Sequence, residues 1–459
     1  MILERKKRIL LFANTEHNAE CVGEHIRAIQ AGSPDQWFVV NSLTNRLAHK
    51  IDLNFFDAVG FHYSIHPQEK YYCSNELKQK VSEFGGVVFQ FLQDEYLRVH
   101  LASQAMADIG TDLLFTIVRP ELHNIAYDHP GLNQMRRVTV LAGYAPKPRV
   151  NPEFIPIQDR KIDLFYRSRV CPLCSGSLGY EKSLIAKEVS HRAPQFGLKI
   201  DVSVREEDRL YGQDWVRAMS SCRATLGSES GASIWDRDGT IERLIDEEMG
   251  KSSGQSFEAL LETVLKPYDG KLIYSSISPR VFEAAALKTP QILFPGWYNG
   301  LIKPGVHFLQ LEKDFSNFSE IVNALRNDEL LSNLAENAYR DLIASEKYTE
   351  RVLGELVHEN LTELIQKKGF VPKSLDSENL RKNLQINWCH LPFNGVRNLQ
   401  AECELAISQF VEVVQNPRFR GLRKLGRMFE LLKRYLTHLA PRISMPFKKK
   451  MTKKISQPA

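Results

Sequence analysis

The sequence alternates short apolar runs with helical segments, and it does so in two successive series. The apolar runs of the first series are residues 8–14, 37–41, 58–63, 86–90, 113–118 and 138–143. Between them, the segments 18–29, 75–84 and 96–108 have the apolar spacing of amphipathic helices. This alternation is typical of a parallel sheet covered by helices, because parallel strands need long crossover connections. Few other folds accommodate it.

A proline-rich stretch over 146–156 interrupts this rhythm and predicts an interdomain linker. The second series follows at once, with apolar runs at 161–166, 199–204, 224–226, 272–274, 291–294 and 307–311. Its helical segments are 181–189, 213–221, 241–248, 257–265, 279–287 and 318–327. A chain of 459 residues is also too long for one hydrophobic core. We therefore predict an α/β fold with two Rossmann-like domains facing across a cleft, residues 1–147 and 148–368, and a helical, basic extension over 369–459.

Composition favours a soluble globular protein of the cytoplasm. Hydrophobic residues make up 43% of the chain and charged residues 25%, which is the ordinary globular range. No apolar run approaches the ~20 residues needed to span a bilayer. Seven cysteines are scattered along the chain, an odd number that argues against a disulfide framework. The pair Cys171 and Cys174 lacks further zinc ligands at a recognisable spacing, so we expect no metal site.

The charge is divided unevenly along the chain. Residues 417–459 contain thirteen Lys or Arg residues and one acid, Glu430, a net charge of +12. Because the total is +5, the remainder of the chain carries −7. This division predicts that the tail meets a polyanion or an anionic membrane surface. The segment 422–439 has the spacing of an interfacial helix, and equally that of a helix docked on the protein.

In the first domain, the candidate residues follow from where ligands bind in open α/β sheets, beyond the carboxyl ends of the strands. His62 lies in the third run and Asp94 follows the fourth. A histidine at a strand end is more often structural, although its pKa suits proton transfer. The pair Asp94 and Glu95 could also simply favour the helix that follows. No G-x-G-x-x-G motif is present here, so a nicotinamide or flavin fingerprint is missing.

In the second domain, the residues after the first strand are cationic. Arg167 and Arg169 follow it directly and suit a diphosphate, although two surface arginines are an equal alternative. The loop 175–179 enters the helix that contains Lys182, and the loop 226–233 contains Ser230 and Gly231. Glycine and serine in such loops let backbone amides approach an anion, but they also occur in plain turns.

The stretch 277–296 predicts a capped helix followed by a buried strand. Ser278 occupies the capping position before Pro279, which suits the first turn of a helix. Arg280 and Glu283 then share one face of that helix. Taken alone, Glu283 is more often a solvated helix carboxylate than a ligand contact.

The pattern Ser-Pro-Arg-Val-Phe-Glu-Ala-Ala-Ala-Leu-Lys-Thr-Pro over 278–290 resembles the donor-binding helix of two-Rossmann-domain (GT-B) glycosyltransferases. Further motifs are similar to one bacterial branch of them, the glycosyltransferase family 1-like or spore-maturation-type branch of cell-surface polysaccharide synthesis. They are Phe-Tyr-Arg-Ser-Arg from residue 165, Gly-Ser-Leu-Gly-Tyr-Glu-Lys from residue 176 and Gly-Ser-Glu-Ser-Gly-Ala-Ser from residue 227. The strong motifs cover about residues 160–345.

The resemblance implies a glycosyltransferase that moves a sugar from a nucleotide-diphosphate-sugar to a glycan or lipid-linked acceptor. It implies that Arg167, Arg169, Lys182, Ser230, Gly231, Ser278, Arg280 and Glu283 bind the donor, with Glu283 on the ribose. Asp94 or His62 would be the catalytic base. The second acid of many retaining members is replaced by Ser275. The alternative is a catalytically silent GT-B-fold protein that binds nucleotide-sugar or glycan.

The expected partners are therefore a nucleotide-sugar donor, a glycan or lipid-linked acceptor and an anionic membrane surface that contacts 417–459. We expect no cofactor and no required metal, because cations and helix dipoles can stabilise the leaving diphosphate. We also expect no nucleic acid partner, because no recognisable binding motif accompanies the basic tail. The expected location is the cytoplasm, peripherally at the inner face of the membrane.

Overall fold

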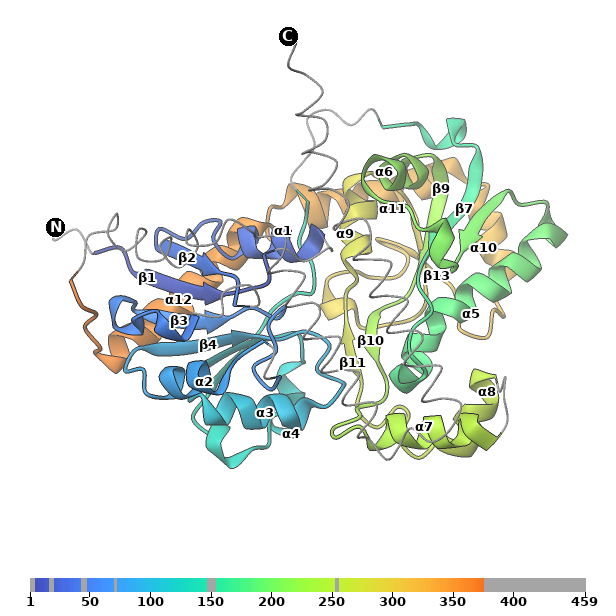
Figure 1. Cartoon of the computed structure of the whole chain (residues 1–459). Coiled ribbons are helices and arrows are strands. Elements are labelled where there is room, and N and C mark those ends of the chain that lie inside the picture. The colour runs from blue at the N-terminus through green and yellow to red at the C-terminus, as the bar shows by residue number, and fades with distance from the viewer. Residues whose placement is uncertain are drawn as a thin grey trace, which may run out of the picture.

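The computed structural model describes residues 5–15, 20–42, 48–69, 72–146, 154–251 and 256–374, which form two lobes around two parallel sheets (Figure 1). The predicted class, two Rossmann-like α/β domains facing across a cleft, is confirmed. Most of the predicted helical extension, residues 375–459, lies outside the described residues.

The first lobe is built on a six-stranded parallel sheet in the order β2-β1-β3-β4-β5-β6. Its strands are β1 (Arg8–Phe12), β2 (Gln36–Val40), β3 (Ala58–Phe61), β4 (Val87–Phe91), β5 (Leu113–Thr116) and β6 (Arg136–Thr139). The covering helices are α1 (Glu20–Ala28), α2 (Asn75–Ser82), α3 (Val99–Asp108) and the short α4 (His123–Ala126). Every residue of β1, β3, β4 and β5 is buried, as expected for central strands with helices on both faces.

The second lobe contains a five-stranded parallel sheet in the order β13-β12-β9-β7-β8. Its strands are β7 (Ile162–Arg167), β8 (Ile200–Ser203), β9 (Cys222–Gly227), β12 (Gln291–Leu293) and β13 (Leu309–Gln310). Its helices are α5 (Gly176–Arg192), α6 (Gly212–Ser220), α7 (Thr240–Lys251), α8 (Phe257–Leu260), α9 (Pro279–Ala286), α10 (Phe318–Leu325) and α11 (Asp328–Ala338).

The second lobe also contains a two-stranded antiparallel sheet, and it departs from the prediction. It pairs β10 (Ser230–Ala232) with β11 (Tyr274–Ser276). We predicted the run 272–274 as a strand of the parallel sheet and predicted no strand at 230–232. Three-residue strands carry too little periodicity to reveal their partner, so pairing here was decided by the surrounding packing.

The last described helix, α12 (Glu350–Lys368), returns to the first lobe. Its buried residues Leu353, Val357 and Leu361 pack in the same core as Ile9 and Leu11 of β1. Figure 1 shows this helix, in orange, alongside the blue strands of the first lobe. The predicted second domain of residues 148–368 thus includes one helix that belongs to the first core by packing, and the domain boundaries stay a prediction.

Contact between α12 and α1 requires a glycine. A Cβ atom at Gly354 would lie 1.4 Å from the carbonyl oxygen of Ala31, at the end of the α1 segment. Gly23 within α1 is a useful contrast, because the nearest atom to a Cβ there is the flexible Arg27 side chain at 3.4 Å. The close approach of the two helices therefore depends on the missing side chain at Gly354.

We expect Gly354→Ala to lower the free energy of unfolding by about 1–3 kcal/mol, because the added methyl group forces α12 away from α1. The matched control, Gly23→Ala, should raise stability by up to ~1 kcal/mol through its better helix propensity. Chemical denaturation of both variants measures the difference. Equal stability of the two would contradict this account of the α1–α12 packing.

Candidate functional site

A cleft of about 1260 Å³ separates the two lobes. The first lobe lines it with α1 and with the segments after β3, β4 and β6, and the second lobe with α6, α9 and the β10–β11 sheet. Most of these are the carboxyl ends of parallel strands or the helix starts that follow them, where ligands of open α/β sheets bind. The cleft is therefore the candidate site.

A buried carboxylate ties the two lobes together at this cleft. Glu95 accepts hydrogen bonds from the hydroxyl groups of Thr116 (2.6 Å) and Tyr127 (3.2 Å) on one oxygen. On its other oxygen it accepts one from Tyr274 of β11 (2.7 Å), in the second lobe. Burial raises the pKa of Glu95, although the bonds from Thr116 and Tyr274 oppose that shift. The network fixes the position of the first-lobe loop that precedes α3.

Asp94 lies at the edge of this network and lines the cleft. Its φ of 59° is in the left-handed region, which costs most residues energy and which aspartate tolerates better than most. Its backbone N–H donates to the Tyr274 hydroxyl at 3.1 Å. The Tyr274 contact thus holds the strained backbone so that the exposed Asp94 side chain is at the cleft. Its predicted role as a base stays a prediction.

His62, the other predicted base, is fully buried. Its ring contacts His25 of α1 at 3.0 Å and the Ser64 hydroxyl at 2.8 Å. His25, and not His62, lines the cleft. In this arrangement His62 is behind the cleft wall, so direct contact with a ligand is not favoured by the geometry.

On the opposite wall, Glu283 of α9 lines the cleft and accepts a hydrogen bond from the indole N–H of Trp215 at 2.9 Å. The guanidinium of Arg280 does not point outward beside Glu283, as the helical spacing suggested. It lies over the rings of Tyr166 (5.2 Å) and Trp215 (5.4 Å), and its Nε is buried and makes no hydrogen bond to a described residue. One aromatic residue of α6 therefore contacts both polar residues of α9.

Three cations of the second lobe lie close to one another, although none of them lines the cleft. Burial lowers the pKa of Lys182, and the positive charges of Arg280 and Arg169 lower it further. Cys171 and Asp94 act in the opposite direction. Within the described part of the chain, neither Lys182 nor Arg169 forms an ion pair. A cluster of mutually repelling cations, in which Lys182 and Arg169 have no ion-pair partner among the described residues, is suited to an anionic ligand.

Two helix N-termini in this lobe differ in what satisfies their amides. At α9, Ser278 occupies the capping position, but its hydroxyl makes no capping hydrogen bond, contrary to the prediction. At α5, the amide of Ser177 donates to Asp269 (3.0 Å) and that of Leu178 donates to the Ser233 hydroxyl (3.0 Å). The α5 terminus is thus satisfied within the protein, and α9 is the better anion site of the two.

Of the remaining residues predicted to bind the donor, two line the cleft and Arg167 does not. Ser230 and Gly231 of β10 line the cleft. Gly231 has a φ of 131°, and a Cβ there would lie 1.9 Å from the Tyr274 carbonyl oxygen, so only glycine fits. Arg167, by contrast, donates to the carbonyl of Asp208 (2.9 Å) and to the Asp201 carboxylate (2.5 Å), and it is only 13% exposed. These hydrogen bonds hold Arg167 within the second lobe, and it is not among the residues that line the cleft.

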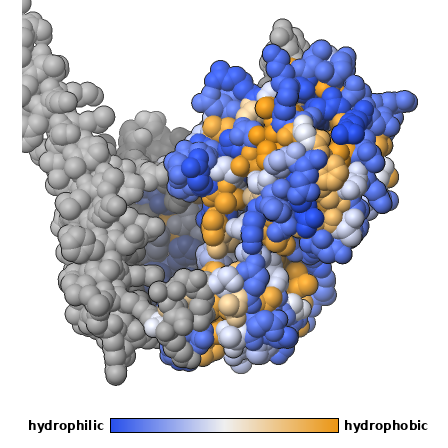
Figure 2. Space-filling model, turned by 90° about the vertical axis from the view of Figure 1, so that its right-hand side faces the viewer, coloured by the Kyte–Doolittle hydropathy of each residue, from blue (hydrophilic) through white to orange (hydrophobic). Residues whose placement is uncertain are grey.

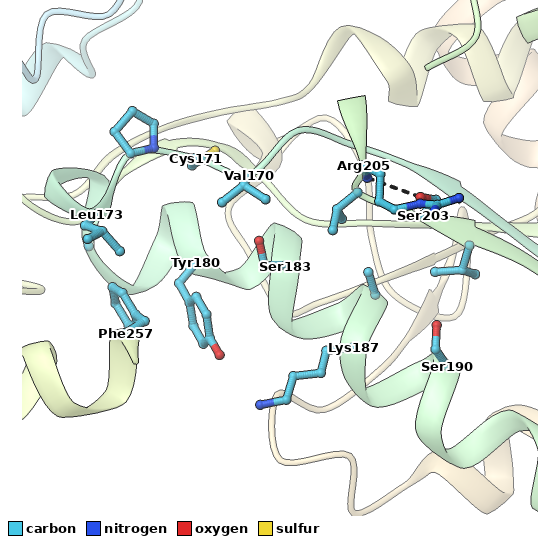
Figure 3. Close-up of a pocket in the computed structure, with 15 residues that line it drawn as sticks. Val170, Cys171, Leu173, Tyr180, Ser183, Lys187, Ser190, Ser203, Arg205 and Phe257 are labelled. Atoms are coloured by element: carbon cyan, nitrogen blue, oxygen red, sulfur yellow. Dashed lines mark hydrogen bonds between the residues drawn. The ribbon is translucent and has the colours of Figure 1, made fainter. Parts of the chain in front are cut away.

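A second pocket, of about 600 Å³, lies on the second lobe between α5 and the segments 170–173 and 202–205. Hydrophobic residues form patches among hydrophilic ones on the face of this lobe shown in Figure 2. In Figure 3, Tyr180, Ser183, Lys187 and Ser190 lie along α5, with Phe257 beside Tyr180 and Arg205 across the pocket. This pocket shares no lining residue with the cleft, and it holds none of the predicted site residues.

Metal and membrane features can be stated only for the described residues. Among them, no group of three or more His, Cys, Asp or Glu side chains is arranged to hold a metal ion. In the same residues, no helix is both long and apolar enough to cross a bilayer. The expectations of no metal, no cofactor and a cytoplasmic location stay predictions.

Sequence reasoning missed three residues of this site: His25, Trp215 and Tyr274. Each occurs inside a segment that reads as an ordinary amphipathic helix or buried strand, without a local motif. The only available signal for Trp215 was a large aromatic residue in the helix before β9. Tyr274 and His25 acquire their roles solely from partners distant in sequence.

No protein-family model matches this chain, and no curated protein matches its sequence. Among solved structures, the chain is similar to TarM (TM-score 0.42, 10% identity), covering 70% of this chain and 57% of that one. It is also similar to Anabaena HepE in complex with UDP and glucose (TM-score 0.42, 10% identity; 78% of this chain and 100% of HepE).

An alpha-glucosyltransferase in complex with UDP gives a TM-score of 0.44 at 10% identity, over 78% of this chain and 100% of its own length. Other complexes of an alpha-glucosyltransferase contain DNA. The expected absence of a nucleic acid partner of this chain stays a prediction. Likenesses this distant carry no argument about function.

The raised pKa of Glu95 predicts a pH dependence. Its ordinary value is 4.5, and the folded value is higher, so the folded state binds the proton more tightly than the unfolded state. The wild type should therefore lose stability relative to Glu95→Gln as the pH rises from 4.5 through the folded pKa. Denaturant unfolding of both proteins between pH 4 and pH 8 measures this difference. The prediction would be contradicted if the difference in unfolding free energy between the two proteins did not change with pH, or if the wild type gained stability relative to Glu95→Gln as the pH rose.

Proposed function

We propose that this protein is a glycosyltransferase that moves a sugar from a nucleotide-diphosphate-sugar to a glycan or lipid-linked acceptor. The observation that carries the proposal is the second-lobe wall of the cleft. It presents a carboxylate, Glu283, and the uncapped start of α9; Lys182, Arg169 and Arg280 lie close to one another in the same lobe, outside the cleft lining, and neither Lys182 nor Arg169 forms an ion pair with a described residue. A carboxylate for ribose hydroxyls beside cations for a diphosphate is the pair of groups that a nucleoside diphosphate requires.

The cation cluster also suits the chemistry. Transfer leaves a negatively charged nucleoside diphosphate, and Lys182, Arg169 and Arg280 would stabilise that charge as it develops. Asp94 extends from the opposite lobe toward the same cleft, and its charge acts on Lys182. We assign to Asp94 the role of accepting the acceptor hydroxyl's proton. His62 is less suited to that role because it is fully buried.

A role in bacterial cell-surface polysaccharide synthesis, in the spore-maturation-type branch, belongs to this proposal and rests on the sequence resemblance alone. The second candidate is a catalytically silent protein with the same fold that binds nucleotide-sugar or glycan. Ser275 favours this second candidate, because it occupies the position of the second acid of many retaining members. Its side chain is buried and accepts a hydrogen bond from Arg119. Donor binding without transfer or hydrolysis would support the silent protein.

We expect Glu283→Ala to weaken UDP binding by about 10- to 100-fold, because hydrogen bonds to a charged group contribute ~1.5–3 kcal/mol. Calorimetric titration with UDP, GDP, ADP and TDP identifies the nucleotide, and turnover of the matching sugar nucleotides tests transfer. Glu320→Ala, an exposed glutamate on α10, is the matched control and should bind normally. Unchanged affinity in Glu283→Ala would remove the ribose role.

The basic tail is proposed to hold the enzyme on an anionic membrane. Residues 417–459 lie outside the described residues, so this proposal rests on their charge of +12. Each basic residue near such a surface contributes ~1 kcal/mol. Deleting 417–459 should abolish binding to phosphatidylserine vesicles at low salt and leave donor turnover in solution intact. Retained vesicle binding would refute the tether, and loss of RNA binding instead would favour a nucleic acid partner.

A further inference from the structure

His25 stands where a first-lobe residue can contact a ligand. It lines the cleft from α1 and is 9% exposed. Two aromatic rings pack edge-on against its imidazole ring, with centroid distances of 5.0 Å to Tyr63 and 5.4 Å to Phe91. Its Nδ1 is bonded to His62, whereas its Nε2 makes no hydrogen bond to any described residue and is not fully buried. Nε2 is thus the ring atom available to a ligand in the cleft.

The hydrogen bonds behind His25 determine which of its nitrogens carries the proton. The backbone N–H of Ser64 donates to Nδ1 of His62 at 3.1 Å. A backbone amide can only donate, so Nδ1 of His62 must be the acceptor. The proton of a neutral His62 is then on Nε2, which lies 3.0 Å from Nδ1 of His25. His62 donates, His25 accepts on Nδ1, and the proton of His25 is on Nε2.

The same contacts disfavour a charged His25. A second proton would go to Nδ1 and would face the N–H of His62 at hydrogen-bonding distance. Burial independently lowers the pKa of His25 to about 4. The ionisable groups that line the cleft near it are Cys21, Glu24 and Arg27 on α1, Tyr63 after β3 and Asp94 after β4. His25 is therefore a neutral donor at physiological pH, and it lacks a free lone pair for base chemistry.

We propose that His25 donates a hydrogen bond from Nε2 to an oxygen of the sugar acceptor, and that His62 and Ser64 are positioning residues for it. This inference rests on the proposed function. The acceptor is favoured over the donor because His25 comes from the first lobe, whereas the cations suited to the diphosphate come from the second.

The first arm of the test reads the tautomer directly and needs no ligand. In the full-length protein with ¹⁵N-labelled histidine, long-range ¹H–¹⁵N spectra distinguish a protonated Nε2 from a protonated Nδ1, and His25→Gln assigns the signals. We expect His25 protonated on Nε2 and not titrating between pH 8 and pH 5.5. In His62→Phe, mixed tautomers of His25 should appear. A His25 protonated on Nδ1, or titrating near the ordinary ~6.5, would overturn the proposal.

The second arm measures function with UDP as the donor-site probe and aryl glycosides of glucose, galactose, N-acetylglucosamine and rhamnose as acceptor probes. His25→Ala should keep UDP affinity within about twofold and raise the acceptor KM ~3- to 10-fold, the effect of one neutral hydrogen bond. His25→Gln, which retains a donor, should recover part of that loss. His191→Ala, an exposed histidine on α5, is the matched control and should behave as wild type.

The two failures are distinguishable. An unchanged acceptor KM in His25→Ala, or a loss of UDP affinity there, would overturn the acceptor role. Failure of the wild type to bind any nucleotide would instead overturn the proposed function, and the spectra would still decide whether His25 presents its Nε2 proton to the cleft.

Discussion

The buried carboxylate of Glu95 is the interaction on which the geometry of the cleft depends. It is satisfied by hydroxyl groups from both lobes, and Tyr274 also accepts the backbone N–H of the left-handed Asp94. A buried carboxylate is costly unless each oxygen has a donor, so separating the lobes at this point would leave Glu95 with an unpaired oxygen. Short main-chain bonds reinforce this contact, with Arg98 donating to Asp236 (2.6 Å) and Asp236 to Tyr96 (2.8 Å). The relative placement of the two cleft walls follows from these contacts.

The two walls are chemically different, and the difference suits transfer between two substrates. The second-lobe wall presents Glu283 and the uncapped start of α9, with the cations Lys182, Arg169 and Arg280 in the same lobe but outside the cleft lining, whereas at α5 the protein's own Asp269 takes the place an anion would occupy. Trp215 organises α9 by bonding Glu283 and stacking against Arg280. The first lobe presents Asp94 and the neutral His25 instead. This difference is the basis of the proposed arrangement, with an anionic donor on the second-lobe side and a hydroxyl-bearing acceptor on the first-lobe side.

Much of the fold could be predicted because its signals are local. Continuous apolar runs such as 8–12 identify buried parallel strands, and the proline-rich linker separates the two series. Asp94, Ser230, Gly231 and Glu283 could be identified as cleft residues because strand ends in such sheets converge on one edge. The β10–β11 pairing and the return of α12 to the first core could not be predicted, because neither a short strand nor an amphipathic helix face indicates which element it packs against.

The amino-acid sequence by itself determined the two parallel α/β sheets, the acidic body with its basic tail, and a polar edge on each domain, since periodicity, charge and strand ends are properties of neighbouring residues. Tertiary structure alone decided which of those polar residues are available. Arg167 pairs with Asp201, and His62 lies behind His25. Arg280 packs on aromatic rings, while Lys182 has no ion pair among the described residues. Each outcome depends on a partner from another element, and only packing brings those partners within hydrogen-bonding distance.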